Sequence, residues 1–503
     1  MKKILHFPLF YLLTLSLILR LPSLFEPYWY LDEAMYLTIG DAMRHGLKLY
    51  TDIFDNKPPG IYFLAMLAPS LFYFKLISTI FALASVTLFY KLVGKLDVPN
   101  RLQLLASLVF VLLTSTPVLE GNIANAEIFL MTFTLAGLYL FFRDEHAVIP
   151  AKAEIQVNSR RVCPTLWRTL IVGFLFGIAF LFKIHALFEL MALLTFIWIS
   201  HLHRLDDLRE LIVQTSVLTL GFVLPIASFI FLFHSQGTLS EFIYSSLLSN
   251  FSYVNAFAPP EIIGGVRITL FLRLAVLSTF LAFFFKTRKR FTNVEILAYL
   301  WFLLALFAVL LSSRNYPHYL LQLTPPLSLI LALQLLGKIE TRISTTILIL
   351  LLVFSLQFYN FQAYPILSYY DNVRLYLTGQ RDQEAYLNRY DSHVTLVNEV
   401  SAYLRTNLDE GDRIFVIDNL PQIYTLSKRL PALKYITLFQ LMDQEDAENI
   451  VSGLLTTPPD IIVEIDWNDV TNPEVAQVLH QIMERDYKEE TTIRSATLWR
   501  RKH

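Results

Sequence analysis

The residues with the clearest chemical potential lie between positions 26 and 60. Asp32 and Glu33 follow a short aromatic run, and the sequence DNKPPG at 55–60 places Lys57 directly before two prolines. A carboxylate such as Asp32 can act as a general base toward a hydroxyl group. Consecutive prolines fix an extended backbone and donate no hydrogen bond, so they would hold Lys57 as a point charge suited to phosphate. If both motifs serve chemistry, they would combine proton transfer with phosphate binding.

Each motif also has a purely structural interpretation. Asp32 and Glu33 would begin a short helix over 34–44, where Asp32 would cap the first turn and both would complement the helix dipole. Lys57 would be an interface lysine whose stem lies along apolar surface. The Asp-Glu pair alone does not decide between capping and catalysis.

Further ionisable or polar side chains interrupt or border later apolar runs. They are Glu127, Lys183, His185, Arg314, His318 and Tyr319. Ionisable groups in such positions are costly and are therefore candidates for function. Each alone would fit an anchor or a helix contact, but all fall on the same side of the membrane in the topology described below. As a set they indicate a site that handles a membrane-borne phosphate.

The composition is that of a membrane protein. Of the 503 residues, 55% are hydrophobic and only 17% are charged, and the mean hydropathy is +0.49. Soluble domains average about 25% charged residues. A net charge of −1 provides no basic field to attract nucleic acid, so none is expected as a partner. The single cysteine, Cys163, excludes an internal disulfide and a cysteine-rich metal site.

Apolar runs long enough to cross a bilayer, roughly 20 residues each, recur through the first three-quarters of the chain. The predicted spans are 4–24, 72–93, 102–119, 124–142, 168–182, 184–200, 211–233, 266–285, 293–312, 318–336 and 343–362. Lys183 and His185 divide 168–200 in two, because one span of that length would overshoot the bilayer. Lys and Arg concentrate in alternate loops, which places the N-terminus in the cytoplasm and the tail outside.

The composition changes near residue 366. Short β-type runs at 413–418 and 460–466 alternate with helical patterns at 393–407 and 473–489. Strands that alternate with helices are typical of a small α/β domain. The predicted fold class is therefore mainly α, a polytopic membrane protein of about eleven transmembrane helices, with a C-terminal soluble α/β domain.

Two domains are expected. Residues 1–365 would form the multi-span membrane domain, with a large first outside loop at 26–60, and residues 366–503 would form an extracytoplasmic α/β domain. The long polar loop 143–167 is interpreted as a cytoplasmic insertion. We expect the protein in the inner or plasma membrane of the cell.

The chain resembles the GT-C class of glycosyltransferases that use polyprenyl-phosphate sugars, particularly bacterial relatives of protein O-mannosyltransferases and of the lipid A aminoarabinose transferase. The motifs that carry the resemblance are YLDEA at 30–34 with Tyr36, DNKPPG at 55–60, NAE at 125–127, GIAFLFK at 177–183, RNYPHY at 314–319 and IYTLSKR at 423–429. The resemblance covers nearly the full length. It implies a GT-C-like fold and a hexosyl- or pentosyltransferase that moves a sugar from a polyprenyl-phosphate carrier to an acceptor hydroxyl, with inversion, on the extracytoplasmic face.

The resemblance also implies roles for individual residues. Asp32 would be the general base, and Glu33 would orient the acceptor or the loop. Lys57, Arg314 and Lys183 would neutralise the carrier phosphate as it leaves, which is charge stabilisation of the kind that usually contributes most to catalysis.

His318 and Tyr319 would contact the phosphate or the sugar, with Asp55 and Glu127 in support. Some relatives have a carboxylate where this chain has Asn56. For that reason we assign no metal and no other cofactor, since a divalent ion would lack a clear ligand set. The expected partners are the lipid bilayer, the lipid-linked donor and an acceptor that is a protein, lipid or glycan.

Two other function classes remain as alternatives. A transporter or flippase of polyprenyl-linked glycan would also have many spans, but it predicts paired halves with polar groups and broken helices near the bilayer midplane. Here the ionisable residues gather toward the outside edge, and the halves do not match. A membrane-anchored binding protein would need far fewer spans. The transferase interpretation is therefore favoured.

Overall fold

The structure, a computed structural model, describes residues 8–96, 98–143, 165–201, 206–250, 270–312, 314–336, 338–444, 447–466, 470 and 472–502. The chain divides into two compact units. Unit 1 comprises Met1–Leu21, Ser78–Ser235 and Ser249–Ile366. Unit 2 comprises Pro22–Ile77, Gln236–Leu248 and Leu367–His503.

Unit 2 therefore groups the first loop with the C-terminal tail, whereas the predicted division after residue 365 places that loop with the spans. The two compact units are groups of residues that pack together, and they do not test the predicted domain boundary. The two domains therefore remain a prediction. The expected insertion at 143–167 lies almost entirely outside the described residues.

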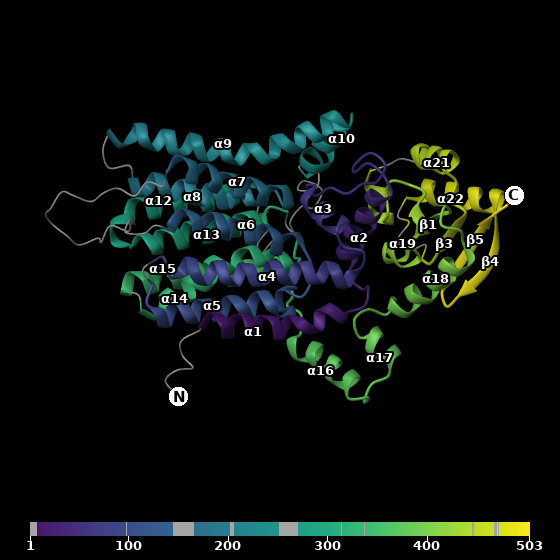
Figure 1. Cartoon of the computed structure of the whole chain (residues 1–503), viewed down its shortest axis with the longest axis horizontal. Coiled ribbons are helices and arrows are strands. Elements are labelled where there is room, and N and C mark those ends of the chain that lie inside the picture. Colours follow the sequence, from purple (N-terminus) through teal and green to yellow (C-terminus); the bar gives the residue numbers. More distant parts are fainter. Residues whose placement is uncertain are drawn as a thin grey trace. The chain divides into compact units, whose positions relative to one another are not determined.

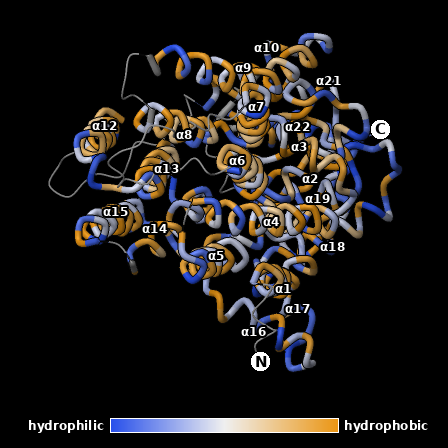
Figure 2. The backbone as a smooth tube through the Cα atoms, turned by 60° about the vertical axis from the view of Figure 1, so that its left-hand side comes forward, coloured by the Kyte–Doolittle hydropathy of each residue, from blue (hydrophilic) through white to orange (hydrophobic). Residues whose placement is uncertain are grey.

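Unit 1 is a bundle of apolar helices that lie side by side (Figure 1). Its helices are α1 (Pro8–Arg20), most of α4 (Leu71–Val93), α5 (Asn100–Ser115), α6 (Ala126–Phe142), α7 (Leu166–Phe182), α8 (Ala186–His201), α9 (Asp206–Ser235), α12 (Leu270–Thr287), α13 (Asn293–Leu310), α14 (Thr324–Leu336) and α15 (Ile339–Phe358). Short 3-10 turns at Pro117–Leu119 (η3) and Pro317–Leu323 (η7) precede α6 and α14. Hydrophobic residues run along α4 and α13 (Figure 2).

Each predicted span corresponds to a helix of this set, and α7 and α8 are separate as expected. By length and composition, six helices in the described part of the chain suffice to cross a membrane, and four shorter apolar helices accompany them. The predicted fold class is confirmed: this is a mainly α, multi-pass membrane protein with a C-terminal α/β domain. The number of crossings and the orientation stay predictions.

Small residues let α7 and α9 pack closely. A methyl group at Gly173 would overlap the carbonyl oxygen of Leu218, and one at Gly177 would overlap that of Phe222. Gly221 of α9 meets the backbone of α7 in the same way. Small residues four apart allow helix backbones to approach in a membrane, where van der Waals packing is a main source of association.

Unit 2 begins with helices from the first loop, α2 (Leu31–Arg44) and α3 (Gly60–Met66). A short α10 (Leu239–Ile243) continues into a π-helical turn at Tyr244–Leu248. The helices of the tail are α16 (Ile366–Leu377), α17 (Gln383–Asn388), α18 (Val394–Asn407), α19 (Gln422–Ser427), α20 (Leu438–Gln444), α21 (Ala447–Thr456) and α22 (Pro473–Asp486). Its strands are β1 (Arg413–Ile417), β2 (Leu430–Pro431), β3 (Ile461–Glu464), β4 (Tyr487–Ile493) and β5 (Ala496–Arg501).

The strands form one sheet in the order β2-β1-β3-β5-β4. β1 is parallel to β2 and β3, with Ile414 opposite Ile461, while β5 is antiparallel to β3 and β4. The strands predicted at 413–418 and 460–466 are confirmed. The helix predicted over 473–489 ends too late, because buried Tyr487 already starts β4, whose β-branched residues favour a strand.

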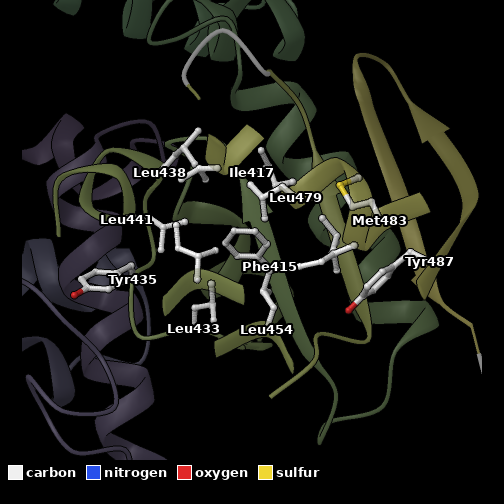
Figure 3. Packing of buried hydrophobic residues seen from close by; sticks show 14 of the residues in the cluster. Phe415, Ile417, Leu433, Tyr435, Leu438, Leu441, Leu454, Leu479, Met483 and Tyr487 are labelled. Atoms are coloured by element: carbon white, nitrogen blue, oxygen red, sulfur yellow. The ribbon is translucent and has the colours of Figure 1, made fainter. Parts of the chain in front are cut away.

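The core of this α/β domain also receives a residue from the first loop. Phe415 lies among Leu433, Leu441, Leu454 and other buried side chains (Figure 3). Phe54 belongs to the same cluster. Burying a side chain of this size stabilises by about 1.5–3 kcal/mol, so the first loop is fastened to the tail by hydrophobic packing.

Candidate active site

The first turn of α2 carries both acidic residues of the first motif. The helix begins at Leu31 with Tyr30 as its N-cap, and no side chain caps it, so the capping role considered for Asp32 is wrong. Acidic groups in this turn still complement the helix dipole. The two carboxylates have different surroundings, because the Asp32 side chain is 22% exposed whereas Glu33 is buried.

Asp32 and Lys57 meet in a partly exposed cluster. The Nζ atom of Lys57 lies 3.7 Å from Oδ1 of Asp32 and 3.8 Å from Oδ2 of Asp55. The hydroxyl of Tyr36, one turn along α2, donates to Asp32 Oδ2 at 3.2 Å. Lys57 Nζ also lies 5.0 Å from the centre of the Tyr36 ring, within the range of a cation–π interaction. One cation is therefore held between two carboxylates and an aromatic face.

Asp55 is the buried member of this cluster. Its carboxylate accepts hydrogen bonds from the Tyr62 hydroxyl at 2.7 Å and from Nε2 of Gln440 at 3.2 Å. Burial, together with the negative charge of Asp55, raises the pKa of Tyr62 well above its ordinary value, so this hydroxyl keeps its proton. The Tyr50 hydroxyl donates to the carbonyl of Lys57 at 2.7 Å. These bonds fix the backbone and the anionic neighbour of Lys57.

Glu33 belongs to a separate buried ionic network. Lys75 Nζ lies 2.8 Å from the Glu26 carboxylate and 3.1 Å from that of Glu33, and all three residues are buried. Tyr369 of α16 donates to Glu26 at 2.5 Å, and Trp29 donates to it at 2.9 Å. Buried charges persist only when paired and hydrogen-bonded. The roles of Glu26 and Lys75 were not predicted from the sequence, although a charged residue at the start of an apolar span, as Lys75 is, is a detectable signal.

In unit 1, a second cluster forms where α6 begins and α7 ends. Glu127 is in the first turn of α6, and Lys183 is the C-cap residue of α7. Their side chains form an ion pair. Lys183 Nζ also lies 3.5 Å from the centre of the Tyr319 ring. A carboxylate and an aromatic face therefore hold this cation, as at Lys57.

The η7 segment continues this second cluster. His318 is paired with the carboxylate of Glu120, and its ring stacks on Tyr316 at 5.6 Å and meets Tyr319 edge-on at 4.8 Å. Arg314 donates to the Tyr316 hydroxyl at 3.0 Å. The role of Glu120 was not predicted, because its partner His318 is far away in sequence. Glu120 itself has a left-handed backbone, with φ of 57°.

The structure therefore places the predicted site residues in three groups. In unit 2, Asp32, Lys57 and Asp55 come together, while Glu33 joins the Lys75 network. In unit 1, a continuous chain of contacts joins Arg314, Tyr316, His318, Tyr319, Lys183 and Glu127. Within the described ranges, no three His, Cys, Asp or Glu side chains are placed to hold a metal ion.

Comparison with known proteins supports the fold. No family model and no curated protein matches the sequence. ArnT from Cupriavidus metallidurans, bound to undecaprenyl phosphate, aligns with a TM-score of 0.54 and 13% identity over 97% of both chains. Its apo form aligns with a TM-score of 0.55 and 12% identity over 97% of this chain and 96% of that one. The chain has a GT-C fold.

This GT-C fold confirms the resemblance at the level of architecture. AglB, an oligosaccharyltransferase from Archaeoglobus fulgidus in complex with an inhibitory peptide and a dolichol-phosphate, aligns with a TM-score of 0.45 and 12% identity. That alignment covers 92% of this chain and 70% of AglB. At 13% and 12% identity, the likeness to the two ArnT structures concerns the fold alone.

Proposed function

We propose that the chain is a membrane glycosyltransferase that moves a hexose or pentose from a polyprenyl-phosphate carrier to an acceptor hydroxyl, with inversion. The observation that carries the proposal is the position of the Lys57 ammonium, 3.7 Å from Asp32 and 3.8 Å from Asp55, in a chain with a GT-C fold. This pairing combines a solvent-accessible carboxylate with a cation suited to phosphate.

Asp32 acts as the general base. Its carboxylate takes the proton of the acceptor hydroxyl while that oxygen attacks the anomeric carbon of the donor. The bond between the anomeric carbon and the phosphate oxygen breaks, and the phosphate leaves with the electron pair. Attack from the face opposite the phosphate inverts the anomeric centre. A base positioned in this way contributes typically 10²–10⁴-fold to the rate.

Lys57 stabilises the negative charge that develops on the leaving phosphate, and Asp55 fixes its position. Cations placed where charge develops lower the barrier most, because they need no reorganisation during the reaction. We assign carrier-phosphate binding also to Lys183 and Arg314, with His318 and Tyr319 in contact with the phosphate or the sugar.

Two further carboxylates support the proposed site indirectly. Glu127 holds Lys183 through their ion pair. Glu33 orients the first loop through Lys75, since both are buried in one ionic network. Neither supporting carboxylate contacts the substrate in this proposal, and no metal is assigned. The reaction is proposed for the extracytoplasmic face of the cell membrane, with the N-terminus in the cytoplasm.

The test is transfer by the purified full-length protein in lipid nanodiscs. A panel of undecaprenyl-phosphate hexoses and pentoses is offered together with lipid, glycan and peptide acceptors, and products are identified by mass spectrometry. Nuclear magnetic resonance of the product gives the anomeric configuration, which is expected to be opposite to that of the donor. Absence of transfer from every lipid-phosphate sugar, or a retained configuration, would overturn the proposal.

A further inference from the structure

We infer that the C-terminal α/β domain contributes a positioning residue to the transfer site: its Gln440 holds Asp55, which in turn holds Lys57. The catalytic role of this contact rests on the proposed function. The contacts that carry it all lie within unit 2.

The segment just before Lys57 is built into the tail domain. The backbone N–H of Phe54 donates to the carbonyl oxygen of Lys434 at 2.8 Å. The Phe54 ring is 5% exposed and lies 5.1 Å from the ring of Tyr435, in the same hydrophobic cluster as Phe415. The backbone that leads to Asp55 and Lys57 therefore has its position set by residues from the tail.

Gln440 of α20 reaches the carboxylate next to Lys57. Its Nε2 donates to Oδ1 of Asp55 at 3.2 Å, and the two residues are 5% and 3% exposed. The other oxygen, Oδ2, accepts from Tyr62 and is the one that faces Lys57 at 3.8 Å. Oδ1 also accepts the backbone N–H of Asn56 at 2.7 Å. Because Gln440 and Asn56 bind one oxygen and Tyr62 binds the other, the plane of the carboxylate is fixed. Removal of a donor from a buried charged acceptor has a large penalty, which makes Gln440 a positioning residue.

The tail also holds the helix that carries Asp32. Thr38 of α2 lies 2.7 Å from the Thr425 hydroxyl and donates to the carbonyl of Pro421 at 3.1 Å. The same domain therefore contacts both α2 and the segment that contains Lys57. The separation between the proposed base and the proposed phosphate-binding cation depends on this domain.

The test compares two equally buried glutamines of the tail. Gln422 is 3% exposed and donates to the backbone carbonyl of Trp29 at 3.4 Å, not to a carboxylate. In nanodiscs, we expect Gln440→Leu to reduce kcat/KM for the lipid-linked donor about tenfold or more, as the loss of a hydrogen bond to a charged group implies. Gln422→Leu should stay within roughly twofold of the wild type, because its long hydrogen bond goes to a neutral carbonyl and not to the Asp55–Lys57 pair.

A second variant separates positioning from a general loss of fold. Gln440→Glu places a second carboxylate next to Asp55. Two adjacent carboxylates repel each other, so one of them takes up a proton at a higher pH than an isolated carboxylate would. The acidic limb of the pH–rate profile should therefore move to higher pH. A merely structural role would lower the rate equally at every pH and leave the limb in place.

Hydrogen–deuterium exchange makes the inference testable apart from activity. Peptides that cover residues 50–60 should exchange faster in Gln440→Leu than in the wild type or in Gln422→Leu. If the wild type transfers no sugar, the proposed function fails, while faster exchange in Gln440→Leu alone would still support positioning. If the wild type is active but the two leucine variants match in rate and exchange, the inference is overturned.

Discussion

The Lys57 ammonium lies 3.7 Å from the Asp32 carboxylate, which joins the two motifs of the first loop into one charged cluster. The cluster depends on parts of the chain that are far apart in sequence, because Gln440 and Phe54 tie the Lys57 segment to the tail. A loop that would otherwise have many conformations is thereby given one arrangement.

Replacement of Lys57 should impair the handling of the donor phosphate. We expect Lys57→Met to lower kcat/KM for the lipid-linked donor by about 10²–10³-fold, the scale of one preorganised electrostatic contact in a transition state. Lys48→Met is the matched control, since Lys48 is in the same loop and its ammonium donates to the backbone carbonyl of Gln236 at 3.3 Å. Steady-state kinetics in nanodiscs measure both. Equal rates for the two variants would contradict the role of Lys57.

The Glu26–Lys75–Glu33 network should be important for stability. Lys75→Met leaves two buried carboxylates without their cation, so we expect a loss of about 3–5 kcal/mol in the free energy of unfolding. The control is Arg374→Met, which breaks an ion pair whose side chains are 58% and 50% exposed and should change stability by about 0–1 kcal/mol. Thermal unfolding in detergent distinguishes them. A melting temperature for Lys75→Met equal to that of the control would show that the network contributes little.

Close packing of α7 on α9 predicts sensitivity to a single methyl group. Gly173→Ala should destabilise by about 1–3 kcal/mol, because the new carbon would overlap the Leu218 carbonyl and force the helices apart. Gly411→Ala adds the same group in open space and should stay within about 0.5 kcal/mol of the wild type. Unfolding of both proteins in one detergent provides the comparison. No loss in Gly173→Ala would contradict the observed helix contact.

Alkaline pH should weaken the C-terminal domain through Tyr487. Burial raises its pKa from an ordinary value of 10.0 to about 12, and its hydroxyl donates to the carbonyl of Pro459 at 2.8 Å. Below pH 10 the hydroxyl is protonated in both the folded and the unfolded state. As the pH rises from 10 to 12, the unfolded state loses this proton first, so stability falls.

Tyr487→Phe provides the check on this pH dependence. The variant should be less stable than the wild type by about 1 kcal/mol below pH 10, because it lacks the hydrogen bond. This difference in the free energy of unfolding should narrow between pH 10 and 12. The wild type loses stability in this range as Tyr487 ionises in the unfolded state, whereas phenylalanine has no proton to lose. Chemical unfolding across this range measures both curves. A constant difference would contradict the raised pKa.

Local patterns predicted the elements of the fold well. Apolar runs located the helices of unit 1, and the interruption at Lys183 correctly separated α7 from α8. Continuous hydrophobic runs identified β1 and β3, whereas the last hairpin was missed because its exposed, charged strands resemble the end of a helix.

The sequence predicted which motifs contribute residues to the candidate site, but not which side chains pair with one another. Residue types and spacing indicated Asp32 and Lys57, and the structure brings them together. Glu33 pairs with Lys75 whereas the adjacent Asp32 pairs with Lys57, because consecutive residues of a helix point in different directions. The pairs His318–Glu120 and Gln440–Asp55 join distant segments, and no local pattern indicates such contacts.

The role of Asp32 as general base is tested by the rate of sugar transfer from undecaprenyl-phosphate donors in the variant Asp32→Asn. Asp41→Asn is the control, because Asp41 is on the same helix but pairs with partly exposed Arg44. We expect Asp32→Asn to lose about 10²–10⁴-fold in turnover, the contribution of a general base, while its affinity for undecaprenyl phosphate should equal that of the wild type. Turnover by Asp32→Asn equal to that of Asp41→Asn would contradict this role.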